Sequence, residues 1–141
     1  MEKRKLIIAS HGGFAQGAVN AATLISGEPD CEVEVFCMSL GETPTAFARK
    51  LEAELIREPD REYVIMADLF GASICNALYP LTRFPNVKLF TDFNLRLLIE
   101  VMSDYKDPLS PEDMETLAAN NRECLRVLRF TDSGKAESED F

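Results

Sequence analysis

Four short runs rich in apolar residues alternate with stretches whose apolar residues recur every three or four positions. This alternation constrains the fold more than any other feature of the chain. The apolar runs are residues 5–9, 33–37, 63–67 and 87–91. The stretches with helical spacing are residues 15–25, 47–55, 74–81 and 95–103. A repeated strand followed by a helix is typical of a mostly parallel sheet with helices on both faces. The sequence therefore predicts an α/β, doubly wound fold with a four-stranded sheet.

Several helix boundaries carry their own signals. Gly27 follows the first helical stretch as a stop. Thr43 and Pro44 predict a cap and a first-turn proline for the second helix. The segment Ser110-Pro-Glu-Asp113 predicts the start of a last helix that runs to about Asn121. Residues 122–130 fit neither period, so they either extend this helix or form a late strand.

The length of 141 residues suits one domain with a real core. We expect the domain to span residues 1–130 and the acidic tail, residues 131–141, to be disordered. No apolar run approaches the roughly 20 residues that span a membrane. The apolar stretch 6–9 is also far too short for a signal peptide. We therefore expect a cytoplasmic protein without membrane insertion.

Charge and motif content exclude several classes of function. The net charge of −9 makes nucleic acid a poor partner, although a basic protein partner stays possible. The four cysteines form no CxxC pair, which argues against a zinc site or a disulfide scaffold. Neither a Walker A sequence nor a GxGxxG motif occurs. We therefore expect neither a metal ion nor a cofactor.

The first predicted strand ends in Ser10-His11-Gly12-Gly13, and His11 is the only histidine of the chain. Chemistry in open α/β sheets gathers at the carboxyl ends of the strands. An imidazole there can act as a nucleophile or a base. Gly12 and Gly13 would let a bulky group approach, and the following helix start would favour an anion. The alternative is a histidine that caps or packs at a turn.

Polar residues also follow the third and fourth predicted strands. The carboxylate of Asp68 could accept a hydrogen bond from one nitrogen of His11 and leave the other as nucleophile, or it could cap a turn. Gly71 and Ser73 open the third helix, where Ser73 either caps the helix or holds a phosphoryl oxygen. Asn94 either contacts a bound group or caps the fourth helix. A receiver of the response-regulator type would instead need acidic residues at the end of the first strand.

Two segments together resemble the enzyme IIA component of the mannose family of the bacterial phosphoenolpyruvate:sugar phosphotransferase system. The first is residues 6–17, an apolar strand that ends in a His-Gly pair before a helix. The second is residues 66–77, with an aspartate, a glycine-containing turn, a serine and an asparagine. Residues 93–95 add a weaker match. The resemblance spans roughly residues 4–130.

The resemblance implies a function and an assembly. His11 would accept a phosphoryl group from the histidine-containing phosphocarrier protein and pass it to a IIB component for sugar uptake. The chain would thus be a phosphotransferase component with a phosphohistidine intermediate. Asp68 would orient the ring, and Ser73 would lie beside the phosphoryl group. Members of the family are homodimers that exchange a C-terminal strand, which gives a use for residues 122–130.

The chain also departs from the family pattern. Arg96 replaces a common proline, which alters the partner surface or adds a cation near the phosphoryl group. Gly71-Ala72 has one glycine where the family often has two. No fused IIB domain follows residue 130, so we expect a free-standing IIA subunit. Alternatives are the phosphotransfer subunit of a dihydroxyacetone kinase, a regulatory phosphohistidine protein, and a binding module with a structural His11. The sequence does not identify the sugar.

Overall fold

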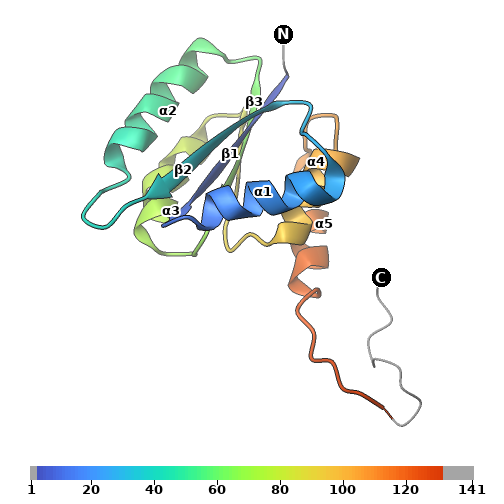
Figure 1. Cartoon of the computed structure of the whole chain (residues 1–141). Helices are drawn as coiled ribbons and strands as arrows, with labels where there is room; N and C mark the ends of the chain where they lie inside the picture. The colour runs from blue at the N-terminus through green and yellow to red at the C-terminus, as the bar shows by residue number, and fades with distance from the viewer. Residues whose placement is uncertain (1–2, 132–141) are drawn as a thin grey trace. The chain divides into compact units, whose positions relative to one another are not determined.

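The computed structural model describes residues 3–131, and the chain divides between Leu109 and Ser110 into two compact units. Each unit is described by itself. The first unit contains, in chain order, β1 (Arg4–His11), α1 (Phe14–Ser26), β2 (Glu32–Met38), α2 (Thr45–Arg57), β3 (Glu62–Ala67), α3 (Ser73–Leu78), the 3-10 helix η1 (Tyr79–Arg83), β4 (Val87–Phe90) and α4 (Leu95–Asp104) (Figure 1). The second unit contains α5 (Pro111–Arg122).

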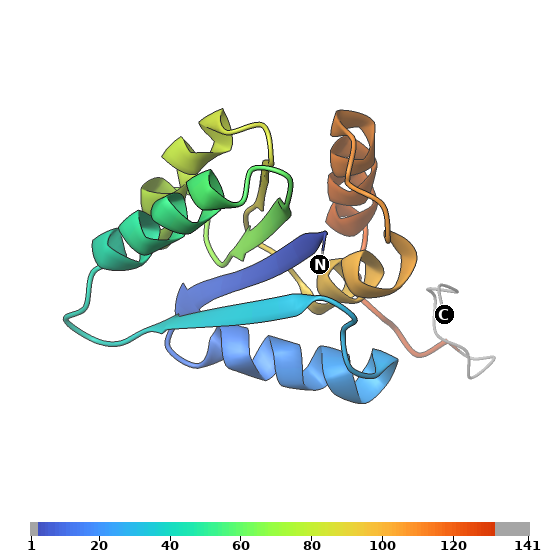
Figure 2. The ribbon, with the colours of Figure 1, turned by 90° about the horizontal axis from the view of Figure 1, so that it is seen from above.

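The four strands form one sheet in the order β2-β1-β3-β4, and each neighbouring pair is parallel (Figure 2). The register pairs Ser10 with Cys37, Ala9 with Ala67, and Met66 with Phe90. The predicted α/β, doubly wound fold with four strands is confirmed. Because the strands run the same way, the turns that follow β1, β3 and β4 meet at one edge of the sheet, which we call the carboxyl edge.

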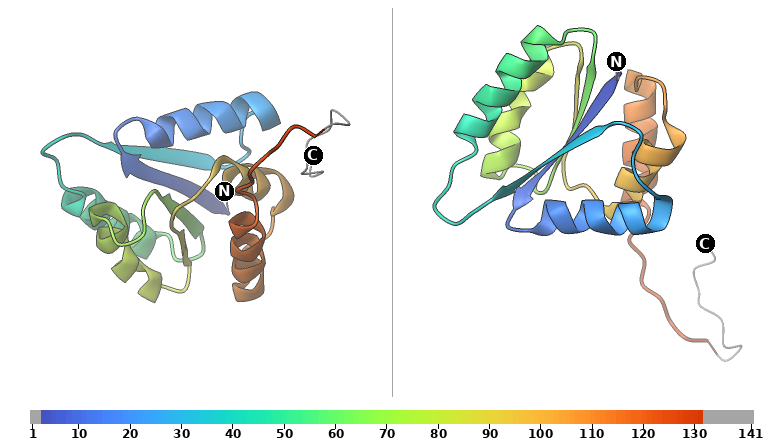
Figure 3. Two further views of the ribbon diagram at one scale, coloured as in Figure 1. Left: turned by 90° about the horizontal axis from the view of Figure 1, so that it is seen from below. Right: turned by 45° about the horizontal axis from the view of Figure 1, so that its top comes forward.

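Helices cover both faces of the sheet, and the alternation of side chains along the central strands explains why. Ile7 and Ile65 pack into a buried cluster with Leu51 of α2 and Ile74 of α3. The intervening residues, such as Ile8, are equally buried and point to the opposite face, where α1 and α4 pack against one another (Figure 3). A central strand buried on both faces is expected to be apolar throughout, as β1 and β3 are.

The opposite end of the sheet, the amino edge, carries ion pairs whose cations are buried. Arg4 Nε donates to Glu62 Oε1 at 2.6 Å, and Lys5 Nζ lies 2.7 Å from a carboxylate oxygen of Glu34 and 2.9 Å from one of Glu54. Both cations are less than one-tenth exposed. Burial alone would lower the pKa of the Lys5 ammonium, but the hydrogen bonds to Glu34 and Glu54 raise it above its ordinary value.

Two of the predicted helix starts have different outcomes. Ser110 and Asp113 form the predicted capping box: the Ser110 hydroxyl accepts from the Asp113 amide, and the Asp113 carboxylate accepts from the Ser110 amide. The predicted Thr43 cap is wrong, because α2 begins at Thr45 with Pro44 in the cap position and no side-chain cap. A proline can occupy that position because the first amides of a helix need no intrahelical acceptor.

The end of the chain is only partly described. Helix α5 ends at Arg122, so the alternative in which residues 122–130 extend this helix is wrong, and among residues 123–131 only Phe130 takes part in a bridge. The exchanged strand stays a prediction. Of the predicted tail, residues 132–141 lie outside the described residues. Within the described part of the chain, no helix has both the length and the apolar character needed to cross a membrane.

Candidate functional site

His11 is the last residue of β1, and the turn that follows fixes its position. The buried Ser10 hydroxyl accepts from the Ala15 amide at 2.7 Å and donates to the Gly12 carbonyl at 3.2 Å. Gly12 has φ +55°, a left-handed conformation that glycine adopts without a steric penalty. Its amide also donates to the Met38 carbonyl of β2. These bonds hold the turn while the imidazole stays 46% exposed.

The carboxylate of Asp68, just after β3, is directed at this imidazole. Asp68 Oδ2 accepts from the His11 amide at 2.7 Å and lies 2.8 Å from His11 Nδ1. A carboxylate can only accept, so Nδ1 carries the proton of this bond. The neutral ring then has its lone pair on Nε2. The predicted pairing of His11 with Asp68 is therefore present in the structure, and it leaves Nε2 without a proton.

The surroundings of Asp68 keep it ionised. Its side chain is only 10% exposed, and Oδ1 accepts from the Leu69 amide at 2.9 Å. Burial raises the pKa of this carboxyl, but the hydrogen bonds from His11 and Leu69 outweigh burial and lower the pKa below its ordinary value of 3.8. At neutral pH Asp68 thus presents a negative charge to the ring.

The turn after β3 brings Gly71 and Ser73 to the same edge. Gly71 has φ +79°, and Asn76 Nδ2 donates to its carbonyl at 2.9 Å. Ala72 occupies the cap position of α3, so the alternative in which Ser73 caps this helix is wrong. Ser73 is the first helical residue, and its exposed hydroxyl has no hydrogen bond with another described residue. This hydroxyl is available to a bound group.

The turn after β4 contains one predicted residue and one that the sequence did not single out. Asn94 caps α4, because its Oδ1 accepts from the Leu97 amide at 2.8 Å; this confirms the capping alternative. Asp92 was not predicted to have a role, yet its Oδ2 accepts from the Phe70 amide at 2.9 Å. The only sequence signal was an aspartate just after a strand.

Exposed apolar side chains also lie at the carboxyl edge. They come from the turns after β2 and β3 and from the start of α1, with exposed fractions of 55% for Phe14, 106% for Leu40, 56% for Leu69 and 80% for Phe70. Large apolar residues gathered at one place on a surface indicate an interaction site. We call these four residues the apolar rim.

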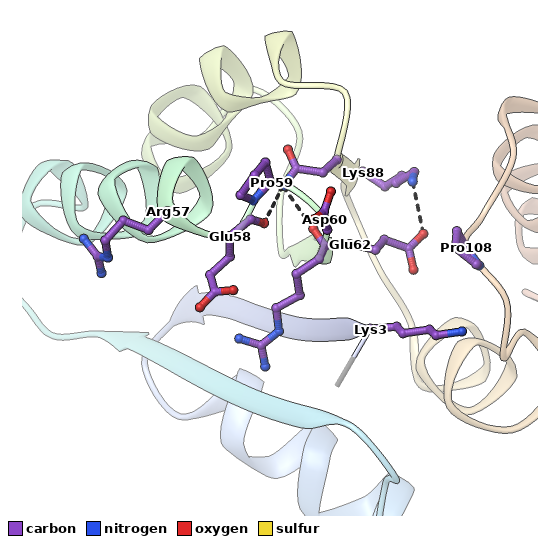
Figure 4. Close-up of a pocket in the computed structure, with 10 residues that line it drawn as sticks. Lys3, Arg57, Glu58, Pro59, Asp60, Glu62, Lys88 and Pro108 are labelled. Atoms are coloured by element: carbon purple, nitrogen blue, oxygen red, sulfur yellow. Dashed lines mark hydrogen bonds and ion pairs between the residues drawn. The ribbon is translucent and has the colours of Figure 1, made fainter. Parts of the chain in front are cut away.

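A pocket of about 620 Å³ lies at the amino edge (Figure 4), and His11 is not among the residues that line it. Its lining includes Lys3, Glu58, Asp60 and Pro108. Much of its polar surface is already paired: Lys88 Nζ lies 3.2 Å from Glu62 Oε2, and Asn86 donates to the carbonyls of Glu58 and Arg61. Among the described residues, no group of three or more His, Cys, Asp or Glu side chains is placed to hold a metal ion.

The fold and the paired His11 and Asp68 define an α/β protein with one oriented, exposed imidazole. Residues 5–118 match the family EIIA-man, described as the PTS system fructose IIA component. The match covers most of the chain, and the chain belongs to this family. The resemblance noted in the sequence is thereby confirmed.

Solved structures agree with this assignment. The PTS IIA protein associated with the fucose utilization operon of Streptococcus pneumoniae is 28% identical, with a TM-score of 0.69 over 85% of this chain and 91% of that one. The mannose/sorbose specific IIA subunit from Enterococcus faecalis shares the fold at 22% identity, with a TM-score of 0.77 over 94% and 98% of the two chains. The component EIIA from Streptococcus agalactiae does so at 22% identity, with a TM-score of 0.73 over 88% and 96%. A comparison with curated proteins finds no match.

Proposed function

We propose that this IIA protein is a phosphoryl carrier of a sugar phosphotransferase system. His11 accepts a phosphoryl group from the histidine-containing phosphocarrier protein and passes it to a IIB component for sugar uptake. The observation that carries the proposal is the 2.8 Å contact between His11 Nδ1 and Asp68, which leaves Nε2 free on a ring that is 46% exposed.

The proposed chemistry is in-line transfer between two histidines. His11 Nε2 attacks the phosphorus of the donor phosphohistidine, the donor P–N bond breaks, and the donor imidazole leaves with its electron pair. The product is a ring with phosphorus on Nε2 and a proton on Nδ1, and it carries a positive charge. Asp68 stabilises that charge. Positioning and charge stabilisation are the main tasks in phosphoryl transfer, because the transition state is loose.

Groups at the carboxyl edge are suited to hold the phosphoryl oxygens. Helix α1 spans 13 residues, and the amides of its first turn favour an anion. Gly12 and Gly13 add no side chain that would obstruct a phosphoryl group, and the space beside both residues is open. Ser73 would donate its hydroxyl and Gly71 would admit the group closely. Asn94, whose oxygen is used as a cap, would offer its amide N–H groups.

The apolar rim supports a protein as donor and acceptor. Protein interfaces place apolar residues at the centre of the contact and polar groups around it. The chain presents such apolar residues at the edge of the sheet that carries His11, namely Phe14, Leu40, Leu69 and Phe70. The net charge of −9 would also speed the encounter with a basic partner.

We also propose the homodimer that the resemblance implies. Leu125, Val127, Leu128 and Phe130 are exposed by 94%, 78%, 62% and 87%. Such residues gain free energy when they are covered, and β2 and β4 are edge strands that can pair with another chain. We propose that residues 122–130 add to an edge strand of a second copy.

The test is phosphorylation by phosphoenolpyruvate and the two general phosphotransfer proteins. We expect acid-labile, base-stable phosphate on His11 of the wild-type chain and none on His11→Ala, which has no histidine left. Label that persists on the alanine variant would contradict the assignment. Mixing the phosphorylated chain with a IIB component or with a dihydroxyacetone kinase then identifies the acceptor, and transfer only to the kinase would replace the sugar route.

A further inference from the structure

Asp92 has an unusual backbone conformation at the carboxyl edge. Its φ of +51° lies in the left-handed region, where it is alone among the described residues other than glycine. A residue with a Cβ is uncommon there, although aspartate tolerates this region better than most. Such conformations persist where surrounding contacts compensate for them, and they cluster at functional sites.

Two hydrogen bonds join the turn that contains Asp92 to the end of β3 and to the turn that follows it. Asp92 Oδ2 accepts from the Phe70 amide at 2.9 Å, and the Phe93 amide donates to the Ala67 carbonyl at 3.4 Å. With Asp92 in the left-handed conformation, its carboxylate binds the Phe70 amide while the next amide, that of Phe93, binds the Ala67 carbonyl. The carboxylate thus compensates for an unfavourable backbone conformation.

The Phe70 amide lies between the two groups proposed to act on the phosphoryl transfer. Within this turn the Leu69 amide donates to Asp68 Oδ1, and the Ala72 amide donates to the Leu69 carbonyl at 3.2 Å. Asp92 holds the amide between these two. Asp92 is therefore a contact from outside the turn on the segment between Asp68 and Ser73, in addition to Asn76, whose Nδ2 donates to the Gly71 carbonyl.

A third contact, between two aromatic side chains, links the turn after β4 to the start of α1. The ring of Phe93, which is buried, packs against that of Phe14 with 5.3 Å between centroids. Phe14 begins α1, three residues after His11. The turns after β1, β3 and β4 are thus joined in a circuit by the pairs His11 and Asp68, Phe70 and Asp92, and Phe93 and Phe14.

We propose that Asp92 is a positioning residue for phosphoryl transfer at His11. It acts through the Phe70 amide, which holds the turn that carries Asp68 and Ser73 in the geometry that the transfer needs. This inference rests on the proposed function. It goes beyond it by assigning a role to a residue that touches neither the imidazole nor the phosphoryl group.

Three variants separate the hydrogen bond from the backbone conformation. Asp92→Asn keeps an acceptor oxygen and tolerates the left-handed region. Asp92→Gly favours that conformation but removes the acceptor, and Asp92→Ala loses both advantages. A matched control is Asp113→Ala on α5, which also removes a carboxylate that accepts a backbone amide at 2.9 Å.

The readouts are the single-turnover rate of phosphoryl transfer to His11, the ¹⁵N shifts of the His11 ring, and the melting temperature. We expect Asp92→Asn and the control to transfer within about threefold of wild type. Asp92→Gly and Asp92→Ala should be slower by roughly tenfold or more, because small displacements of catalytic groups are costly. In both slow variants the ¹⁵N shifts should report a mixture of His11 tautomers, which a purely structural role would not produce.

A folded Asp92→Gly that transfers at the wild-type rate and keeps one tautomer would overturn the inference. So would a Phe70 amide that exchanges with solvent without protection in the wild-type protein, a measurement that requires no variant. A wild-type chain that never becomes phosphorylated would instead refute the proposed function, so the two failures are distinguishable.

Discussion

Replacement of Asp68 by asparagine should slow phosphoryl transfer to His11 while it preserves the fold. Asp68 accepts from the His11 amide, from His11 Nδ1 and from the Leu69 amide, at 2.7, 2.8 and 2.9 Å. An asparagine has one acceptor oxygen and can satisfy a backbone amide with it. Its NH₂ group would then face Nδ1 and favour the tautomer whose proton lies on Nε2, which removes the nucleophilic lone pair.

The size of the effect follows from the charge that develops on the ring. A hydrogen bond to a charged group contributes about 1.5–3 kcal/mol. If that contribution is lost in the transition state, the rate falls roughly 10- to 150-fold at about 1.4 kcal/mol per factor of ten. The change of tautomer should bring the fall in rate toward the upper end of this range. The imidazole is 46% exposed, so water can partly replace the carboxylate and limit the loss.

The assay is rapid-quench transfer from the phosphorylated carrier protein under single-turnover conditions. Asp113→Asn, in the capping box of α5, is the matched control and should keep the wild-type rate. Both variants should melt cooperatively. Transfer by Asp68→Asn within twofold of wild type would refute the argument that Asp68 orients and stabilises the His11 ring.

Further outcomes are expected elsewhere in the chain. Ser73→Ala should transfer roughly tenfold more slowly with an unchanged melting temperature, because its hydroxyl has no partner among the described residues; equal rates would remove Ser73 from the site. Lys5→Met should lower the free energy of unfolding by roughly 3 kcal/mol at neutral pH, measured with urea. Burial would raise the pKa of Glu54, but the hydrogen bond from Lys5 lowers it below 4.5, so this stabilisation is present above pH 4.5 and is lost as the pH falls through the lowered value. A deficit in Lys5→Met that stays constant down to pH 2 would contradict this assignment. Phe130→Asp should shift the sedimentation of the chain from dimer to monomer, and a dimer that persists would exclude a contact through Phe130.

Much of the fold followed from sequence periodicity, because strands buried on both faces are continuous apolar runs and helices repeat every three or four residues. Parallel strands also made it possible to predict that His11 and Asp68 meet. The contact between Asp92 and Phe70 was not predictable in this way, since it depends on a left-handed backbone conformation after β4. The role of the Ser10 hydroxyl was also not predictable, because its hydrogen bonds to the Ala15 amide and the Gly12 carbonyl depend on the path of the turn after β1.

Capping preference by residue type did not identify the N-cap residue of α2 or of α3. Thr43 and Ser73 are good capping residues by type, yet Pro44 and Ala72 occupy the two cap positions. Capping preference by residue type is a weak signal and does not by itself fix the residue at which a helix starts. Residues 122–130 lacked a period because their apolar residues are exposed in the described chain rather than packed on one face.

The separation of the two sheet edges has a consequence for how such proteins can diverge. The buried cations Arg4 and Lys5, with their carboxylate partners, lie at the amino edge, whereas His11 and the apolar rim lie at the carboxyl edge. Substitutions in the rim therefore leave the main electrostatic contributions to folding intact. Exposed turn residues can therefore change during evolution, and the binding partner with them, while the free energy of unfolding stays the same. The imidazole and its carboxylate must be retained.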